Sequence, residues 1–295
     1  DAAAPSPPAG RVGVGAMFKS HCKDTYDSQV FAADFANDPR QAAGHINRWV
    51  SEQTNSMIKR LLEPSDIDAL TAIVLVNALY FDAKWADPFE SEDTRQAPFY
   101  LENGRTRRVP MMRQTSFFPY LRGEGFQAVC LRYRYDYGQD APRFGFYLFV
   151  PDKGRTVAWL REQWTPENWA KWHKAFAETE GEVQLPRFRM EWSYPLNDAL
   201  KALGIEIPFD ADRAEFRRMT AESKQTPLFI QRVLQKATVE LDEQGTRAAV
   251  ASGEAMAMSA VPPATFQIIA DRPFLFAIVH EQTGIVLFLG IVREP

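Results

Sequence analysis

The chain has 295 residues, of which 45% are hydrophobic and 24% are charged, and its formal net charge is −4. This length and apolar content allow a large buried core, in one α+β domain or in two. The small negative charge gives no electrostatic basis for binding nucleic acid, and no apolar run reaches the ~20 residues that cross a bilayer. We therefore expect neither nucleic acid nor a membrane among the partners.

Residues that carry metal or nucleophile chemistry are sparse and poorly spaced for it. The histidines show no H-x-x-x-H or H-E-x-x-H pairing. They are His21, His45, His173 and His280. The two cysteines, Cys22 and Cys130, match no metal spacing, and Cys130 lies in an alternating strand pattern typical of a core thiol. Since a G-x-S-x-G elbow and a glycine-rich phosphate loop are also missing, the sequence predicts no enzyme, no metal and no cofactor.

The amino-terminal part of the chain begins with a low-complexity stretch and continues with a helix. Residues 1–15 are rich in Ala, Pro and Gly, a composition typical of a disordered leader. Asp38 and Pro39 then predict a helix start, because aspartate caps the first N–H groups and proline has none to lose at the first helical position. Four apolar residues fall on one face of this helix: Ala42, Ile46, Trp49 and Val50.

A near-continuous apolar run, AIVLVNALYF, occupies residues 72–81. Such a run predicts a strand that is buried on both faces. Further along the chain, four tryptophans cluster in one helical region; they are Trp159, Trp164, Trp169 and Trp172. We interpret this cluster as packing rather than as a cofactor site.

Residues 243–260, EQGTRAAVASGEAMAMSA, follow a strand-like run at 238–242 and are nearly all small. A segment so poor in bulk cannot anchor itself in a core against ~1–2 kcal/mol of backbone entropy per residue. An alanine-rich helix is the alternative. However, Gly245 and Gly253 interrupt the run, and no apolar stripe recurs at helical spacing. The segment is therefore predicted to be an exposed loop, slim enough to slip between packed strands.

The carboxyl-terminal part contains two apolar strands, within residues 268–278 and 286–290. A tight turn at residues 281–284 joins them, so that the pair predicts a buried hairpin closing the chain.

Several motifs of the chain together resemble the serpin family. The sequence DRPFLF at residues 271–276 follows a Gly-Thr-Arg-Ala stretch and precedes a Leu-Phe-x-Gly strand, as at the carboxyl end of serpins. Residues 46–55 resemble the serpin helix that lies across the large sheet, and residues 72–81 resemble the central strand beside the insertion gap. The resemblance implies an α+β serpin fold: a large mixed main sheet, second and third smaller sheets, and surrounding helices.

This resemblance begins near Met17 and continues to Pro295. It implies a partial serpin domain over residues 16–295, lacking the family's opening helices and first strands. We therefore expect an amino-terminally truncated serpin, either a fragment or a chain that needs a missing amino-terminal segment. No polyanion cofactor can be carried over, because the helix that binds heparin in some serpins belongs to the missing part.

The resemblance implies suicide-substrate inhibition by a metastable fold whose reactive-centre loop spans about residues 245–265. A serine protease would form a covalent acyl complex at the loop, and the cleaved loop would then enter the main sheet. The implied hinge of the loop consists of Glu243, Gly245, Thr246, Ala248, Ala249, Val250 and Ala251. Trp85 would lie at the top of the insertion gap, and Asn77 would partner Gln235 in the shutter, where the family usually has a histidine in place of this glutamine.

Strand periodicity supports insertion of this loop. Side chains alternate along a strand, so the inward positions would be Thr246, Ala248, Val250 and Ser252. All are small or apolar, whereas the charge of Arg247 would face solvent.

The family's spacing puts the scissile bond at Ser259–Ala260, with Met258–Ser259 as the alternative. Because no Arg or Lys lies near either bond, the expected targets are elastase-, chymotrypsin- or subtilisin-like proteases. By resemblance we expect a monomer that is extracellular or secreted, although an intracellular location stays open. The alternative function is a non-inhibitory serpin-fold protein, which would be a chaperone, a carrier or an inactive truncated relic.

Overall fold

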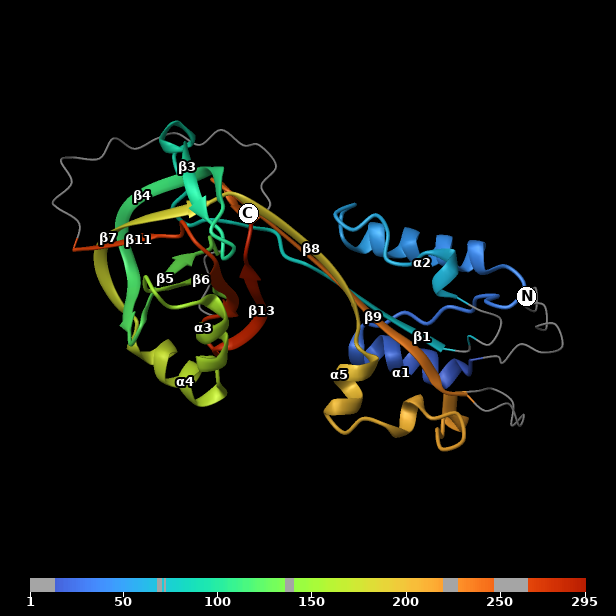
Figure 1. The fold of residues 1–295 in the computed structure, drawn as a ribbon. Coiled ribbons are helices and arrows are strands. Elements are labelled where there is room, and N and C mark those ends of the chain that lie inside the picture. Colours follow the sequence, from blue (N-terminus) through green and yellow to red (C-terminus); the bar gives the residue numbers. More distant parts are fainter. Residues whose placement is uncertain (1–13, 68–70, 72, 136–140, 220–227, 247–264) are drawn as a thin grey trace. The chain divides into compact units, whose positions relative to one another are not determined.

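The computed structural model describes residues 14–67, 71, 73–135, 141–219, 228–246 and 265–295 (Figure 1). The chain forms two compact units. The first comprises Asp1–Tyr80 and Glu191–Thr238, and the second comprises Phe81–Met190 and Val239–Pro295. Two strands run through both units, β8 (Phe188–Pro195) and β9 (Ile230–Asp242). The described part of the chain contains no helix that is long and apolar enough to span a membrane.

The first unit combines helices with part of a five-stranded sheet. Its elements are α1 (Ala16–Tyr26), α2 (Pro39–Gln53), η1 (Pro64–Asp66), β1 (Ile73–Tyr80), α5 (Asn197–Ala202), η3 (Ile207–Phe209) and η4 (Arg217–Met219). As predicted, α2 begins at Pro39, and the side chain of Asp38 accepts the backbone N–H of Gln41 at 2.9 Å. The predicted apolar face of α2 is also confirmed, because Ala42 and Val50 are buried and Ile46 and Trp49 pack against the same cluster.

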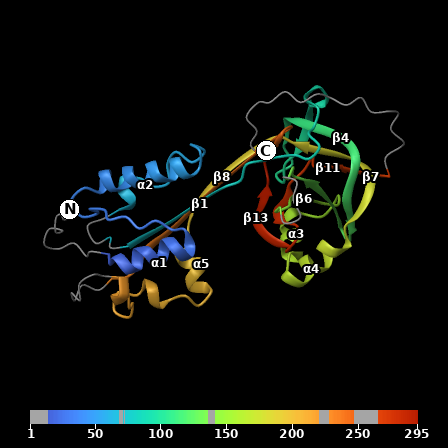
Figure 2. The same ribbon diagram turned by 180° about the vertical axis from the view of Figure 1, so that it is seen from behind.

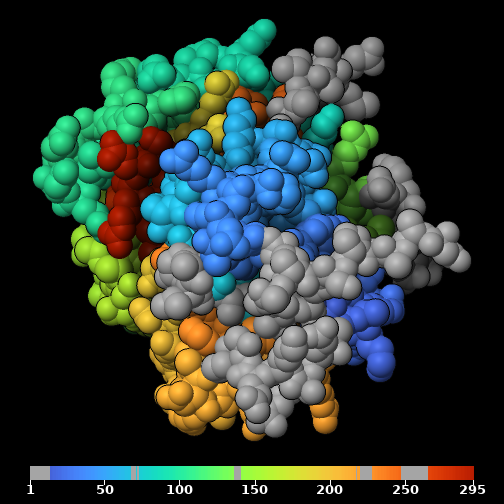
Figure 3. Space-filling model, turned by 90° about the vertical axis from the view of Figure 1, so that its right-hand side faces the viewer, coloured from blue at the N-terminus to red at the C-terminus, as the bar shows by residue number. Residues whose placement is uncertain are grey.

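Strand β1 pairs in parallel with β9, and α2 lies alongside it in both ribbon views (Figures 1 and 2). The face of β1 that packs with α2 carries Val74, Val76, Ala78 and Tyr80. The outer side of α2, drawn in blue, lies at the surface (Figure 3). The prediction that β1 is buried on both faces is wrong. Leu75, on the other face, is 43% exposed, because α2 covers one side of the strand only.

The second unit is built on an eight-stranded sheet. Its elements are β2 (Ala83–Lys84), η2 (Ser91–Asp93), β3 (Arg95–Tyr100), β4 (Thr106–Gly123), β5 (Phe126–Arg132), β6 (Phe144–Pro151), α3 (Val157–Gln163), α4 (Pro166–Ala175), β7 (Ala177–Pro186), β10 (Gly245–Thr246), β11 (Phe266–Ile269), β12 (Phe274–His280) and β13 (Ile285–Val292). The strand order is β11-β7-β4-β5-β6-β12-β13, and β3 also pairs with β4. The second and third sheets expected from the resemblance are continuous here, because β4 is 18 residues long and pairs with β3, β5 and β7. The other, five-stranded sheet, which we call the main sheet, has the order β1-β9-β10-β2, and β8 pairs with β9.

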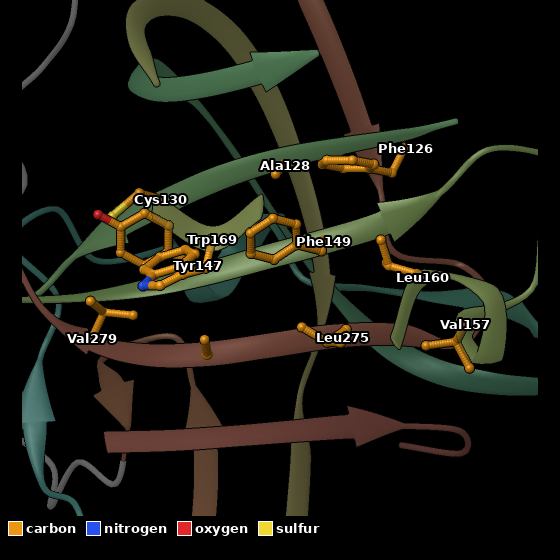
Figure 4. Packing of buried hydrophobic residues seen from close by; sticks show 11 residues of the cluster. Phe126, Ala128, Cys130, Tyr147, Phe149, Val157, Leu160, Trp169, Leu275 and Val279 are labelled. Carbon is orange, nitrogen blue, oxygen red and sulfur yellow. The ribbon is translucent and has the colours of Figure 1, made fainter. Parts of the chain in front are cut away.

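The core of the second unit lies between the eight-stranded sheet and the two helices α3 and α4. Side chains of β5, β6 and β12 meet the apolar side of both helices (Figure 4). The tryptophan cluster is confirmed as packing: Trp164 and Trp169 stack with ring centroids 5.0 Å apart, and both contact the same core. Cys130 is confirmed as a buried core thiol, and burial raises its pKa well above the usual value.

The carboxyl-terminal hairpin is confirmed, with β12 antiparallel to β13 and a turn at residues 281–284. Two details differ from the prediction. The apolar run at 268–278 is split into β11 and β12, because Pro273 has no N–H group to continue a ladder. Only β12 is buried throughout its central part, since β13 exposes Ile285, Leu287 and Leu289.

Candidate functional site

The chain reverses direction immediately after β9. Asp242 is the Cα partner of Gly245 and Leu241 that of Thr246, so β10 is antiparallel to β9 across a two-residue turn. On its other side β10 is antiparallel to β2, where Gly245 pairs with Lys84. The first two residues of the predicted loop therefore already lie between two strands of the main sheet.

Hydrogen bonds fix the turn between β9 and β10. The side-chain oxygen Oδ1 of Asp242 accepts the backbone N–H of Gln244 at 2.8 Å and that of Gly245 at 3.3 Å. Trp85 donates its indole Nε1–H to the Asp242 carbonyl at 3.0 Å and its backbone N–H to the Gln244 carbonyl at 2.9 Å. The backbone N–H of Phe89 binds the Glu243 carbonyl at 2.9 Å. Residues 242–246, which we name the hinge turn, are thus held by the segment that follows β2.

Glu243 is a buried carboxylate with charged and polar partners. Its side chain is 5% exposed, and Oε1 accepts Arg187 Nε at 2.6 Å and Arg187 Nη2 at 2.5 Å. Thr94 donates its hydroxyl to the same oxygen at 2.5 Å. Burial alone would raise the pKa of Glu243, but the bonds from Arg187 and Thr94 outweigh it and hold that pKa below the usual value. The ionised form is therefore the one that ties the hinge turn to the eight-stranded sheet's loops.

Gly245 occupies a position where any side chain would meet backbone atoms of β2. Its φ is 157°, and a Cβ built there would lie 2.2 Å from the Ala83 carbonyl oxygen and 2.7 Å from Lys84 Cα. Both neighbours are backbone atoms and cannot swing aside as a side chain would. The absence of a side chain is what lets the hinge approach β2 so closely.

Thr246 is the last residue of the described range 228–246, and its side chain is fully buried, at 0% exposure. Its hydroxyl lies 2.5 Å from the hydroxyl of Tyr133, and either group can donate. Tyr133 is itself 1% exposed, and its ring stacks on Trp85 with centroids 4.7 Å apart and planes 13° apart. Burial raises the pKa of Tyr133, although the bond to Thr246 opposes this shift, so the phenol stays protonated and neutral.

A second buried carboxylate holds the strand that follows the loop. Glu182 on β7 accepts Gln267 Nε2 of β11 at 2.9 Å, Gln184 Nε2 at 2.6 Å and Arg113 Nη2 at 2.5 Å. Burial raises its pKa, but these three bonds outweigh burial and hold the pKa below the usual value. Strand β11 is only four residues long and pairs with β7 alone in the strand order, and the bond from Gln267 to Glu182 is a second, side-chain link between these two strands.

Of the site residues predicted from the sequence, the structure brings four together: Trp85, Glu243, Gly245 and Thr246. In the first unit, Asn77 and Gln235 are direct neighbours in the β1–β9 register, with Asn77 exposed and Gln235 half-buried. The hydrogen bond between these two side chains stays a prediction.

The remaining predicted positions lie outside the described residues. They are Ala248, Ala249, Val250 and Ala251 of the hinge, and Met258, Ser259 and Ala260 at the alternative reactive bonds. Their roles stay predictions, as does the disordered leader at residues 1–15, of which 1–13 are outside the described part.

Three residues of the site were not singled out from the sequence: Thr94, Tyr133 and Arg187. Arg187 lies in the stretch LPRF at residues 185–188, which also matches the family's order, but nothing in that stretch connects it with Glu243, 56 residues away. Tyr133 lies in an unremarkable RYRYD stretch, 113 residues from its partner. Within the described ranges, no group of three or more His, Cys, Asp or Glu side chains is arranged to hold a metal ion.

The described residues show a hinge turn that places Gly245 and Thr246 between β9 and β2 of a mixed sheet, and comparison with known proteins identifies the class. The family model described as "Serpin (serine protease inhibitor)" matches residues 11–295. The chain therefore belongs to the serpin family, a family of serine protease inhibitors, and the α+β serpin fold expected from the sequence is confirmed.

Individual relatives and solved structures agree with this assignment. The chain is 34% identical over 284 residues to "Leukocyte elastase inhibitor" from Bos taurus, covering 94% of this chain and 73% of the relative. It is 32% identical over 272 residues to "Serpin-ZXA" from Oryza sativa subsp. japonica, covering 92% of this chain and 68% of the relative. The crystal structure of native protease nexin-1 with heparin has a TM-score of 0.82 at 31% identity, over 97% of this chain and 74% of that one.

Proposed function

We propose that this chain inhibits a serine protease as a suicide substrate. The protease's serine oxygen would attack the carbonyl carbon of Ser259, or of Met258 in the alternative register. An ester to the protease forms, the peptide bond breaks, and the amine of the next residue leaves with the proton from the serine. The freed loop, still joined to Thr246, would enter the main sheet and carry the protease with it, so that the ester is not hydrolysed.

The observation that supports this proposal is the direction of β10. Any strand inserted as a continuation of Thr246 must run antiparallel to β9, and β10 already does so, with Thr246 between β9 and β2. The chain reversal, the close approach at Gly245 and the burial of Thr246 are all present before the loop is cut. The loop would therefore need only to extend a strand, not to start one.

Sequence chemistry supports the choice of target. The residues before the two alternative bonds, Met258 and Ser259, are uncharged, and neither has an Arg or Lys beside it. A pocket built for basic residues would gain no ion pair here, whereas an elastase-, chymotrypsin- or subtilisin-like pocket accepts small or apolar side chains. The relative from Bos taurus is named for inhibition of leukocyte elastase.

The direct test is to mix the chain with an elastase-like, a chymotrypsin-like or a trypsin-like protease. We expect an SDS-stable complex with a protease of the first two kinds and none with the third, followed by mass spectrometry to locate the cleaved bond. The matched control is Thr246→Arg, which leaves residues 258–260 unchanged but puts a charge at a fully buried position. This variant should be cleaved at the same bond without forming the complex.

Two results would contradict the proposal. Cleavage of the unmodified chain without any complex would favour the non-inhibitory alternative, and equal complex formation by Thr246→Arg would mean that insertion at the hinge is not needed. We also propose, on family resemblance alone, that the protein acts as a monomer outside the cell. Light scattering of the purified chain and fractionation of the producing cells test these two points.

A further inference from the structure

The contact between Tyr133 and Thr246 joins two buried hydroxyl groups. Both side chains are essentially inaccessible to water, and the two oxygens are 2.5 Å apart. A buried hydroxyl that loses its partner cannot turn to solvent instead, so each group depends on the other. The same site could have been filled by a phenylalanine and a valine at little cost in packing, but without any directional bond.

The bond has a consequence for strand register. Side chains alternate along a strand, so a strand that continues from β10 with Thr246 facing inward would also turn Ala248 and Val250 inward. A slip by one residue would turn Arg247 inward instead, and a buried unpaired charge is costly. A directional bond at the first position adds to this difference between the two registers, because it too is lost when Thr246 turns outward.

Tyr133 is well placed to enforce this choice. Its ring is fixed by stacking on Trp85, whose indole N–H is bound to the Asp242 carbonyl. It is also fixed by Phe81, whose ring centroid lies 4.9 Å away. The hydroxyl therefore extends from a ring that packs between neighbours, one of which, Trp85, is itself bound to the hinge turn.

We propose that Tyr133 is a positioning residue whose hydroxyl pins Thr246 between β9 and β2 and sets the register in which the loop extends the sheet. This inference deepens the proposed function and rests on it for the part that concerns the cleaved loop. The hydrogen bond between Tyr133 and Thr246, which we call the pin, is present in the uncleaved protein and can be tested without a protease.

The first test is hydrogen exchange of the amides at residues 241–246 in the whole chain. Tyr133→Phe keeps the ring and its stacking but removes the bond, and it should raise exchange at the hinge turn by about tenfold. Thr246→Val, which breaks the bond from the other side, should do the same. The double variant leaves neither hydroxyl unpaired and should return exchange to within about threefold of the unmodified chain. Tyr194→Phe, at an exposed tyrosine of β8, is the matched control and should change nothing.

Unchanged exchange in both single variants would overturn the pin. Equal increases in the single and double variants would also overturn it, because they would report lost packing rather than a lost bond. If Tyr133→Phe fails to fold, Thr246→Val and its comparison with Thr246→Ser, which keeps a hydroxyl, decide the question.

The second test measures register with a protease that the unmodified chain traps. Tyr133→Phe should raise severalfold the number of inhibitor molecules consumed per protease trapped, while the rate of loop cleavage stays unchanged. An unchanged ratio would overturn the register role. If the unmodified chain traps no protease, the proposed function fails, and the exchange measurement still decides whether the pin exists.

Discussion

Replacing Arg187 by alanine should destabilise the protein more than removal of an ordinary surface arginine. The substitution takes away the hydrogen bonds at 2.5 and 2.6 Å to the Glu243 carboxylate, whose side chain is only 5% exposed. Breaking a fully buried ion pair costs about 3–5 kcal/mol, and a hydrogen bond to a charged group contributes about 1.5–3 kcal/mol. Arg187 itself is 45% exposed, so water screens part of the interaction. We therefore expect a loss of about 2–3 kcal/mol.

Thermal unfolding followed by circular dichroism measures this loss. In a domain of this size, 1 kcal/mol lowers Tm by roughly 2–4 °C, so Arg187→Ala should lower it by roughly 4–12 °C. The matched control is Arg189→Ala on the same stretch of chain. Arg189 is 56% exposed and lies 3.7 Å from Glu240, a pair expected to contribute at most about 1 kcal/mol.

The pH dependence of this difference provides a sharper check. The pKa of Glu243 is lowered in the folded protein, so its contribution is complete above the unfolded pKa of about 4.3 and is lost as pH falls through the folded pKa. The Tm difference between Arg187→Ala and the unmodified chain should be full at pH 7 and should shrink below about pH 4. Equal Tm values for Arg187→Ala and Arg189→Ala at pH 7 would refute the reasoning.

Three further outcomes are expected. Hydrogen exchange of the β11 amides, corrected for intrinsic rates, should become faster as the pH falls through about 4. The pKa of Glu182 is lowered, so its carboxylate keeps its hydrogen bonds until that pH; exchange that is as fast at pH 7 as at pH 4 would contradict this. Gly245→Ala should lower stability by about 1–3 kcal/mol, measured by thermal unfolding, since the new Cβ would meet the Ala83 carbonyl oxygen at 2.2 Å. A thiol reagent should modify Cys22 in the native chain but Cys130 only in denaturant, because Cys130 is buried with a raised pKa; rapid native modification of both would be the opposing result.

Local features of the fold were predictable from the sequence. Asp38 and Pro39 gave the start of α2 because a helix cap involves only residues within one turn. The apolar run of β1 indicated a strand, but not which face is covered, because that depends on α2, which precedes it. The break at Pro273 was missed because a continuous apolar run outweighed a single residue without an N–H donor.

The site was predictable only in part, for a related reason. The assignment of Gly245 and Thr246 to the hinge of the loop followed from the family resemblance and from their small size. Their partners did not, because Tyr133 meets Thr246 across 113 residues of sequence and Arg187 meets Glu243 across 56. Contacts of this range are set by strand pairing, and composition or periodicity along a single segment carries no signal for them.

The two-residue turn after β9 also bears on kinetics. Starting a new strand is the slow event in sheet growth, because several backbone torsions must be fixed, at a cost in conformational entropy, before the first ladder hydrogen bonds form. In this protein that nucleus is assembled in advance at Gly245 and Thr246. If the cleaved loop lengthens β10 as proposed, strand growth would begin at the propagation stage, and its rate would depend on the separation of β1 from β9 rather than on the formation of a first contact.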